Sequence, residues 1–180
     1  MTLGRRAAVT MAWILLGATV AAAPSEIRVT PIMADGHLYA SFSAPAAFTD
    51  DAQAVLQSGL LLTFTFTIEL RRPSGFWWDR TLGSATVGAT CKFDNLTGTY
   101  LVSKVQDGHV TWSNRTMDAA EARGWMTSFE RVPVATSGAL EANVDYYVHV
   151  RLRATPKRTF SLWPWSADDG AGRAAFTNVR

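Results

Sequence analysis

Alternation of apolar and polar residues dominates the chain and predicts β-strands. In the clearest segment, from Leu62 to Arg71, apolar side chains alternate with threonines and charged residues. A period of two places the two sets on opposite faces of a strand, and β-branched threonine favours that surface. Residues 85–93 and 144–153 alternate in the same way. In the last of these, the side chains expected to face solvent are Asp145, Tyr147, His149, Arg151 and Arg153.

Shorter alternating runs are joined by turn sequences. Residues 27–33 and 38–44 flank Asp35-Gly36, and residues 100–105 and 110–114 flank Asp107-Gly108. Asp-Gly between two strands is typical of a two-residue hairpin turn. Residues 95–98 connect the strand that contains Cys91 to the run at 99–105. Successive hairpins indicate antiparallel sheets.

Two helices are predicted between the strands. Residues 50–57 follow a capping residue, Thr49 or Asp50, and end before Gly59. Residues 117–131 follow Thr116, which can also cap a helix. The expected inner stripe of this second helix is Ala120, Gly124, Trp125, Ser128, Phe129 and Val132.

These elements predict a mainly β fold in one domain, residues 23–180. The expected architecture is an antiparallel β-sandwich or partly open barrel of about eight or nine strands, with one short and one longer helix.

Residues 1–22 predict a secretory signal peptide. Arg5 and Arg6 precede a short apolar run, and small residues follow, with cleavage expected after Ala22. The alternative is an uncleaved N-terminal anchor. Cleavage predicts a periplasmic protein without a stable membrane span. It leaves 15 basic and 15 acidic residues, from 17 and 15, because only Arg5 and Arg6 are lost. A neutral chain gives no argument for nucleic-acid binding.

The sequence offers little for a metal or cofactor, and we expect neither. His37, His109 and His149 stand alone without metal-ligand spacing. Cys91 is the only cysteine, and its place on an apolar strand face predicts a buried, unreactive thiol.

Two carboxylates could form the catalytic pair of a glycoside hydrolase. Glu69 lies on the polar face of its strand, and Asp79 follows Phe76-Trp77-Trp78. Two acids flanking a bond would suit glycoside hydrolysis. Structural pairing of Glu69 with Arg71, Arg151 or Arg153 is the preferred interpretation. We therefore expect no enzymatic activity.

Tryptophan is abundant. Trp112 and Trp125 fit inward faces and are expected in the core, whereas Trp77, Trp78, Trp163 and Trp165 lie in loop-like segments. Those loop indoles either plug the open ends of the core, which we prefer, or bind a ligand or partner at one end of the fold. The candidate binding residues are Trp77, Trp78, Arg80, Arg158, Trp163 and Trp165.

Several segments resemble a bacterial family known as domain of unknown function 4390. They include Leu56-x-x-Gly59-Leu60-x-Leu62-x-Phe64, Arg71-Arg72 with Phe76-Trp77-Trp78-Asp79, Leu96-Thr97-x-x-Tyr100-x-Val102, and Leu162-Trp163-Pro164-Trp165. The chain departs from the family pattern at residues 154–158, where a Leu-Pro-x-Pro segment is usual. The resemblance implies an exported, β-rich, non-catalytic envelope protein, and suggests an envelope partner such as a sensor kinase.

The sequence is therefore consistent with three functions. The first is a periplasmic interaction or accessory module. The second is a binding protein for a small apolar or carbohydrate ligand, which requires a cavity. The third is a hydrolase that uses Glu69 and Asp79. The sequence leaves the oligomeric state open.

Overall fold

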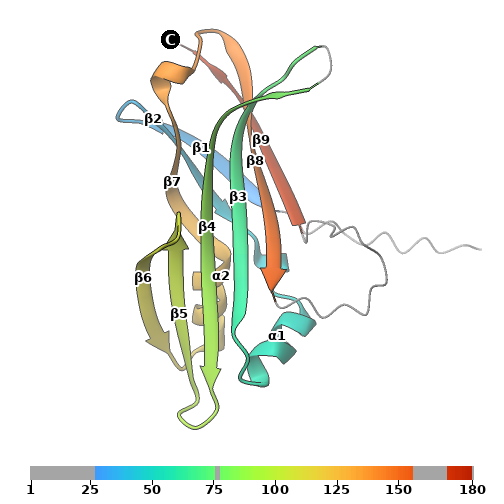
Figure 1. Ribbon diagram of the computed structural model, residues 1–180, viewed down its shortest axis with the longest axis vertical. Helices are drawn as coiled ribbons and strands as arrows, with labels where there is room; N and C mark the ends of the chain where they lie inside the picture. Colours follow the sequence, from blue (N-terminus) through green and yellow to red (C-terminus); the bar gives the residue numbers. More distant parts are fainter. Residues whose placement is uncertain (1–26, 76–77, 156–169, 180) are drawn as a thin grey trace, which may run out of the picture.

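A computed structural model describes residues 27–75, 78–155 and 170–179. These residues form two antiparallel sheets and two α-helices (Figure 1). The strands are β1 Arg28–Ala34, β2 His37–Ser43, β3 Leu62–Arg72, β4 Arg80–Asp94, β5 Thr99–Gln106, β6 His109–Thr116, β7 Ser128–Thr136, β8 Val144–Thr155 and β9 Gly170–Asn178. The helices are α1 Asp50–Gln57 and α2 Ala119–Thr127, with short 3-10 turns at Pro45–Ala47 and Ser137–Ala139.

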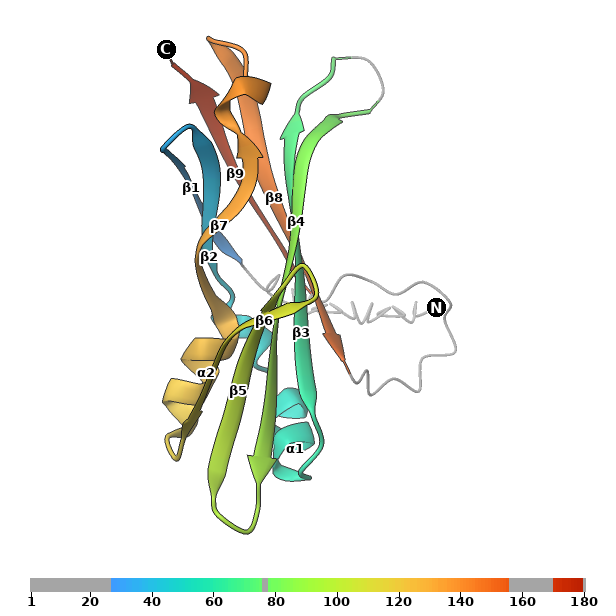
Figure 2. The ribbon, with the colours of Figure 1, turned by 60° about the vertical axis from the view of Figure 1, so that its left-hand side comes forward.

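The two sheets pack face to face over part of their length. The small sheet has the order β1-β2-β7, and the large sheet has the order β6-β5-β4-β3-β8-β9. Figure 2 shows the small sheet and α2 on one side of the large sheet, so that the sheet is covered by strands at one end and by a helix at the other. This arrangement confirms the predicted sandwich or partly open barrel.

Glycine allows a close approach between the two sheets at two places. A Cβ on Gly83 of β4 would lie 2.5 Å from the Val134 carbonyl oxygen of β7. A Cβ on Gly172 of β9 would lie 2.1 Å from the carbonyl oxygen of Ile27, next to β1. A side chain at either position would clash with backbone, so both corners of the sandwich depend on glycine.

Aromatic side chains from both sheets meet in the core. The ring of Phe66 on β3 lies 5.0 Å from that of Phe42 on β2 and 5.3 Å from that of Phe129 on β7. Phe64, Phe66, Ile68 and Leu70 are fully buried, as the alternation in β3 predicted. The hairpin predictions are also confirmed, because Asp35 and Gly36 both have positive φ, as a type I′ turn requires.

The second helix is shorter than predicted. It begins after Asp118, whose side chain accepts the Ala120 amide hydrogen, and ends at Thr127. The chain continues as β7, with a bulge where Ser41 of β2 faces two residues, Glu130 and Arg131. Because of the extra residue, the buried Phe129 and Val132 are three positions apart. Apolar residues three positions apart are typical of one face of a helix, so the sequence suggested a helix here. The predicted helix over 117–131 is therefore wrong beyond Thr127.

Two further expectations need correction at β8 and β9. Tyr147 was placed on the solvent-facing side of its strand, but only 4% of the residue is exposed. It does lie on the outer face, where Arg173 of β9 covers its ring. The strand β9 was not predicted, because small side chains hide its alternation.

Within the described residues no helix is long and apolar enough to cross a membrane.

Candidate functional site

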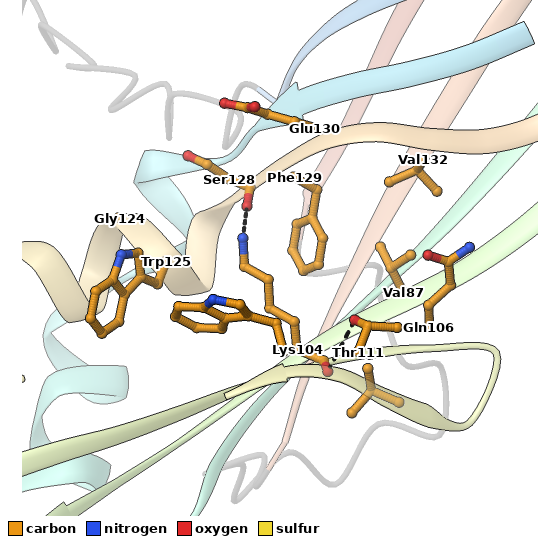
Figure 3. A pocket seen from close by; sticks show the side chains of 12 residues that line it. Val87, Lys104, Gln106, Thr111, Gly124, Trp125, Ser128, Phe129, Glu130 and Val132 are labelled. Atoms are coloured by element: carbon orange, nitrogen blue, oxygen red, sulfur yellow. Dashed lines mark hydrogen bonds between the residues drawn. The ribbon is translucent and has the colours of Figure 1, made fainter. Parts of the chain in front are cut away.

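A pocket lies between the β5–β6 hairpin and the junction of α2 with β7 (Figure 3). It has a volume of about 410 Å³ and is named here the Lys104 pocket. Its lining residues are Val87, Lys104, Val105, Gln106, Thr111, Trp112, Gly124, Trp125, Ser128, Phe129, Glu130 and Val132.

Three elements bring the aromatic walls together. Trp112 on β6 pairs in register with Lys104 on β5, so both side chains lie on the face that α2 covers. Trp125 comes from the last turn of α2, and its ring lies 5.0 Å from that of Trp112 at an interplanar angle of 77°. Phe129 follows at the start of β7. Edge-to-face packing of the indoles fixes one wall of the pocket.

Lys104 provides the positive charge in this pocket. Its Nζ donates a hydrogen bond to the Ser128 carbonyl oxygen at 2.8 Å, shown as a dashed line in Figure 3. The same atom lies 4.9 Å from the centre of the Phe129 ring and 5.7 Å from that of Trp112. Burial lowers the pKa of Lys104, and the charge of Glu130 opposes that shift. Since an ammonium group has three donors, two N–H groups remain without an acceptor among the described residues.

The geometry combines apolar contact with one directed polar contact. Faces of Trp and Phe rings bind apolar or planar groups, and the ammonium group favours a carbonyl or anionic oxygen. Trp112 and Trp125 were predicted in the core, and both do pack against it, but they are only half-buried and also line the pocket. An inward-facing lysine among the apolar positions of β5 is the sequence signal that could have revealed the site.

Two of the six predicted binding residues lie in the described part of the chain. Trp78 is 84% exposed, so it does not plug the core, and Arg80 is exposed at the start of β4. Trp77, Arg158, Trp163 and Trp165 lie outside the described residues.

The strand ends that flank the two tryptophan segments are far apart. Arg72 pairs with Arg80 at one end of β3, whereas Thr155 pairs with Thr63 at the other end. The described residues that precede the two segments therefore lie at opposite ends of β3.

The two carboxylates proposed for hydrolysis make structural contacts. Glu69 forms ion pairs with Arg71 at 2.6 Å and with Arg151 at 3.0 Å, as the pairing interpretation predicted. Asp79 accepts hydrogen bonds from the Tyr147 hydroxyl and, at 3.1 Å, from the Ser74 amide. The Tyr147 hydrogen bond, with that from Ser74, lowers the pKa of Asp79. A general acid requires a raised pKa, so Asp79 is poorly suited to that role.

Metal-binding side chains are not clustered in the described part of the chain. No three His, Cys, Asp or Glu side chains there could hold one ion. Cys91 is fully buried, and desolvation raises its pKa to about 11.

The model of a family described as domain of unknown function (DUF4390) matches residues 22–159 of the chain. The chain belongs to this family. The match covers the Lys104 pocket and the strands β1 to β8. No curated protein and no solved structure matches the chain significantly. The DUF4390 assignment confirms the resemblance seen in the sequence and carries no activity or ligand with it.

Proposed function

We propose that this DUF4390 chain is an exported, non-catalytic binding module of the bacterial envelope and that its ligand site is the Lys104 pocket. The observation that carries the proposal is the position of the Lys104 ammonium group between the rings of Trp112 and Phe129. A volume of about 410 Å³ matches the size of ordinary small-molecule sites. The ligand class that fits is an apolar or planar molecule with one anionic or carbonyl oxygen.

Binding of 1-anilinonaphthalene-8-sulfonate tests the proposal, because this probe joins an apolar ring system to an anionic group. The mature chain should bind the probe saturably at one site, with energy transfer from Trp112 and Trp125. Dodecanoate should displace it. Lys104→Met keeps most of the side chain but removes the charge, and should weaken binding about tenfold, which corresponds to about 1.4 kcal/mol.

The matched control is Lys92→Met, because Lys92 is exposed on β4 and does not line the pocket. Its affinity should equal that of the wild type. Trp125→Ala should also weaken binding, and circular dichroism should show that each variant is folded. If Lys104→Met and Lys92→Met bind the probe equally well, the pocket is not the site.

A second role, as a contact surface for an envelope protein, is favoured by the exposure of Trp78. Large exposed aromatic side chains are frequent anchors in protein interfaces. A sensor kinase is one partner of the kind we expect. Trp78→Ala should keep the wild-type melting temperature and lose capture of such a partner, whereas a lower melting temperature would show that the indole is structural.

A further inference from the structure

The outer face of the large sheet carries a second hollow, on the side opposite the Lys104 pocket. It has a volume of about 240 Å³. Its lining residues are Arg71, Tyr147, His149, Ala171, Gly172 and Arg173. They come from β3, β8 and β9, where Glu69, His149 and Arg173 share one row of the register and Arg71, Tyr147 and Ala175 share the next. The described lining contains two arginines and no carboxylate.

We propose that this hollow binds a phosphate group, carried either by a free small molecule or by a lipid headgroup. The proposal is independent of the Lys104 pocket, since the two sites share no residue.

Arg173 is held in place without an opposite charge bonded to it. Its guanidinium carbon lies 3.6 Å from the centre of the Tyr147 ring, so the two groups are stacked. Tyr147 is itself fixed, because it is buried and its hydroxyl donates to Asp79. Stacking leaves the N–H groups of a guanidinium available for hydrogen bonds. Among the described residues, Arg173 forms no ion pair within 4.0 Å.

Arg71 has an unused donor at the same hollow. Its Nη2 is paired with Glu69 at 2.6 Å, but its Nε is buried and has no acceptor among the described residues. A buried donor of a charged group that lacks a partner is costly. The positive charge of Arg71 beside the hollow would attract an anionic ligand and lower that cost.

The nearby acids are already engaged by other groups. Glu69 is shared between Arg71 and Arg151, and Asp79 accepts from Tyr147 and Ser74. The charge of Asp79 also attracts Arg173 and Arg71, but Asp79 forms no ion pair with either within 4.0 Å. Arg71 and Arg173 stand two strands apart, which is about 9–10 Å between strand axes. A phosphate offers oxygens in several directions, so it can accept hydrogen bonds from both sides at once. A planar carboxylate fits this arrangement less well.

Titration of the mature chain with inorganic phosphate tests the proposal. Two-dimensional NMR should show saturable shifts at the amides of β8 and β9 and at the Arg71 and Arg173 Nε–H signals. Arg173→Gln should abolish them. The matched control is Arg153→Gln, because Arg153 is exposed on the same face but does not line the hollow. It should leave the shifts unchanged.

A thermal measurement guards against a folding defect in the variant. Phosphate should raise the melting temperature of the wild type and of Arg153→Gln, but not that of Arg173→Gln. Shifts that sodium chloride reproduces at equal ionic strength, or that Arg153→Gln also removes, would overturn the proposal.

Vesicles distinguish the two sources of the phosphate group. If the wild type floats with phosphatidylglycerol vesicles but not with phosphatidylcholine vesicles, and Arg173→Gln does not, the ligand is a lipid headgroup. Saturable binding of inorganic phosphate without vesicle flotation supports a free small molecule. Absence of both kinds of binding would refute the site.

Discussion

At the scale of single residues, the two faces of β3 have different consequences for stability. Phe66 is fully buried among aromatic rings, whereas its neighbour Thr65 is half-buried on the outer face. Phe66→Ala should lower the free energy of unfolding by about 3–5 kcal/mol, because it leaves a cavity in the core. Thr65→Ala should change it by no more than about 0.5 kcal/mol. Denaturant unfolding measures both, and equal effects would contradict the register.

Cys91 should be unreactive in the folded protein. Burial raises its pKa to about 11, so only about one thiol in a thousand is ionised at pH 8. A water-soluble thiol reagent should label Cys91 within minutes in denaturant and hardly at all without it. Rapid labelling of the native chain would show that β4 opens at this position.

Some features of single residues were predicted from the sequence, and others were not. The burial of Cys91 and the ion pairs of Glu69 followed from strand alternation, because alternation fixes which face a residue occupies. The Lys104 pocket did not follow, because it forms only when α2 folds back against the β5–β6 hairpin. No alternation or motif in the sequence predicts that contact.

At the scale of elements, two glycines should respond in opposite ways to the same substitution. Nothing lies within 4 Å of a Cβ on Gly124 in α2, so Gly124→Ala should stabilise the helix by about 0.5–1 kcal/mol. Gly83→Ala should destabilise the domain by at least about 1 kcal/mol, because its Cβ would clash with the backbone of β7. Unfolding midpoints measure both changes. A wild-type midpoint for Gly83→Ala would mean that the sheets do not meet at this corner.

The predicted elements were reliable where local chemistry decides the structure. The Asp-Gly turns and the cap at Thr49 depend on neighbouring residues, and the structure reproduces both. The second helix was extended too far because the bulge at Arg131 is defined by pairing with Ser41, a residue 90 positions away. The strand β9 is likewise formed by its pairing with β8, since its own small side chains give a weak pattern.

At the scale of the whole molecule, the two candidate sites occupy opposite faces of one sheet. The strands β3 and β4 run through its centre and pair along nearly their full length, so they provide a rigid support for both sites. The Lys104 pocket depends on α2 and the hairpin, whereas the hollow on the outer face is lined by β3, β8 and β9. Variants in one site should therefore leave binding at the other unchanged.

The predicted leader would direct the chain, and with it both sites, to the periplasm. Arg5, Arg6 and the short apolar run that follows predict a leader that is removed after Ala22. Expression in a Gram-negative host should yield a mature chain that begins at Ala23, and mass spectrometry of the periplasmic fraction measures this directly. Replacing both arginines with glutamate should slow export and leave precursor in the cytoplasm, because the positive n-region is part of the signal. An exported chain that still carries Trp13 would refute cleavage and favour an anchored protein, whose binding sites would then lie beside the membrane.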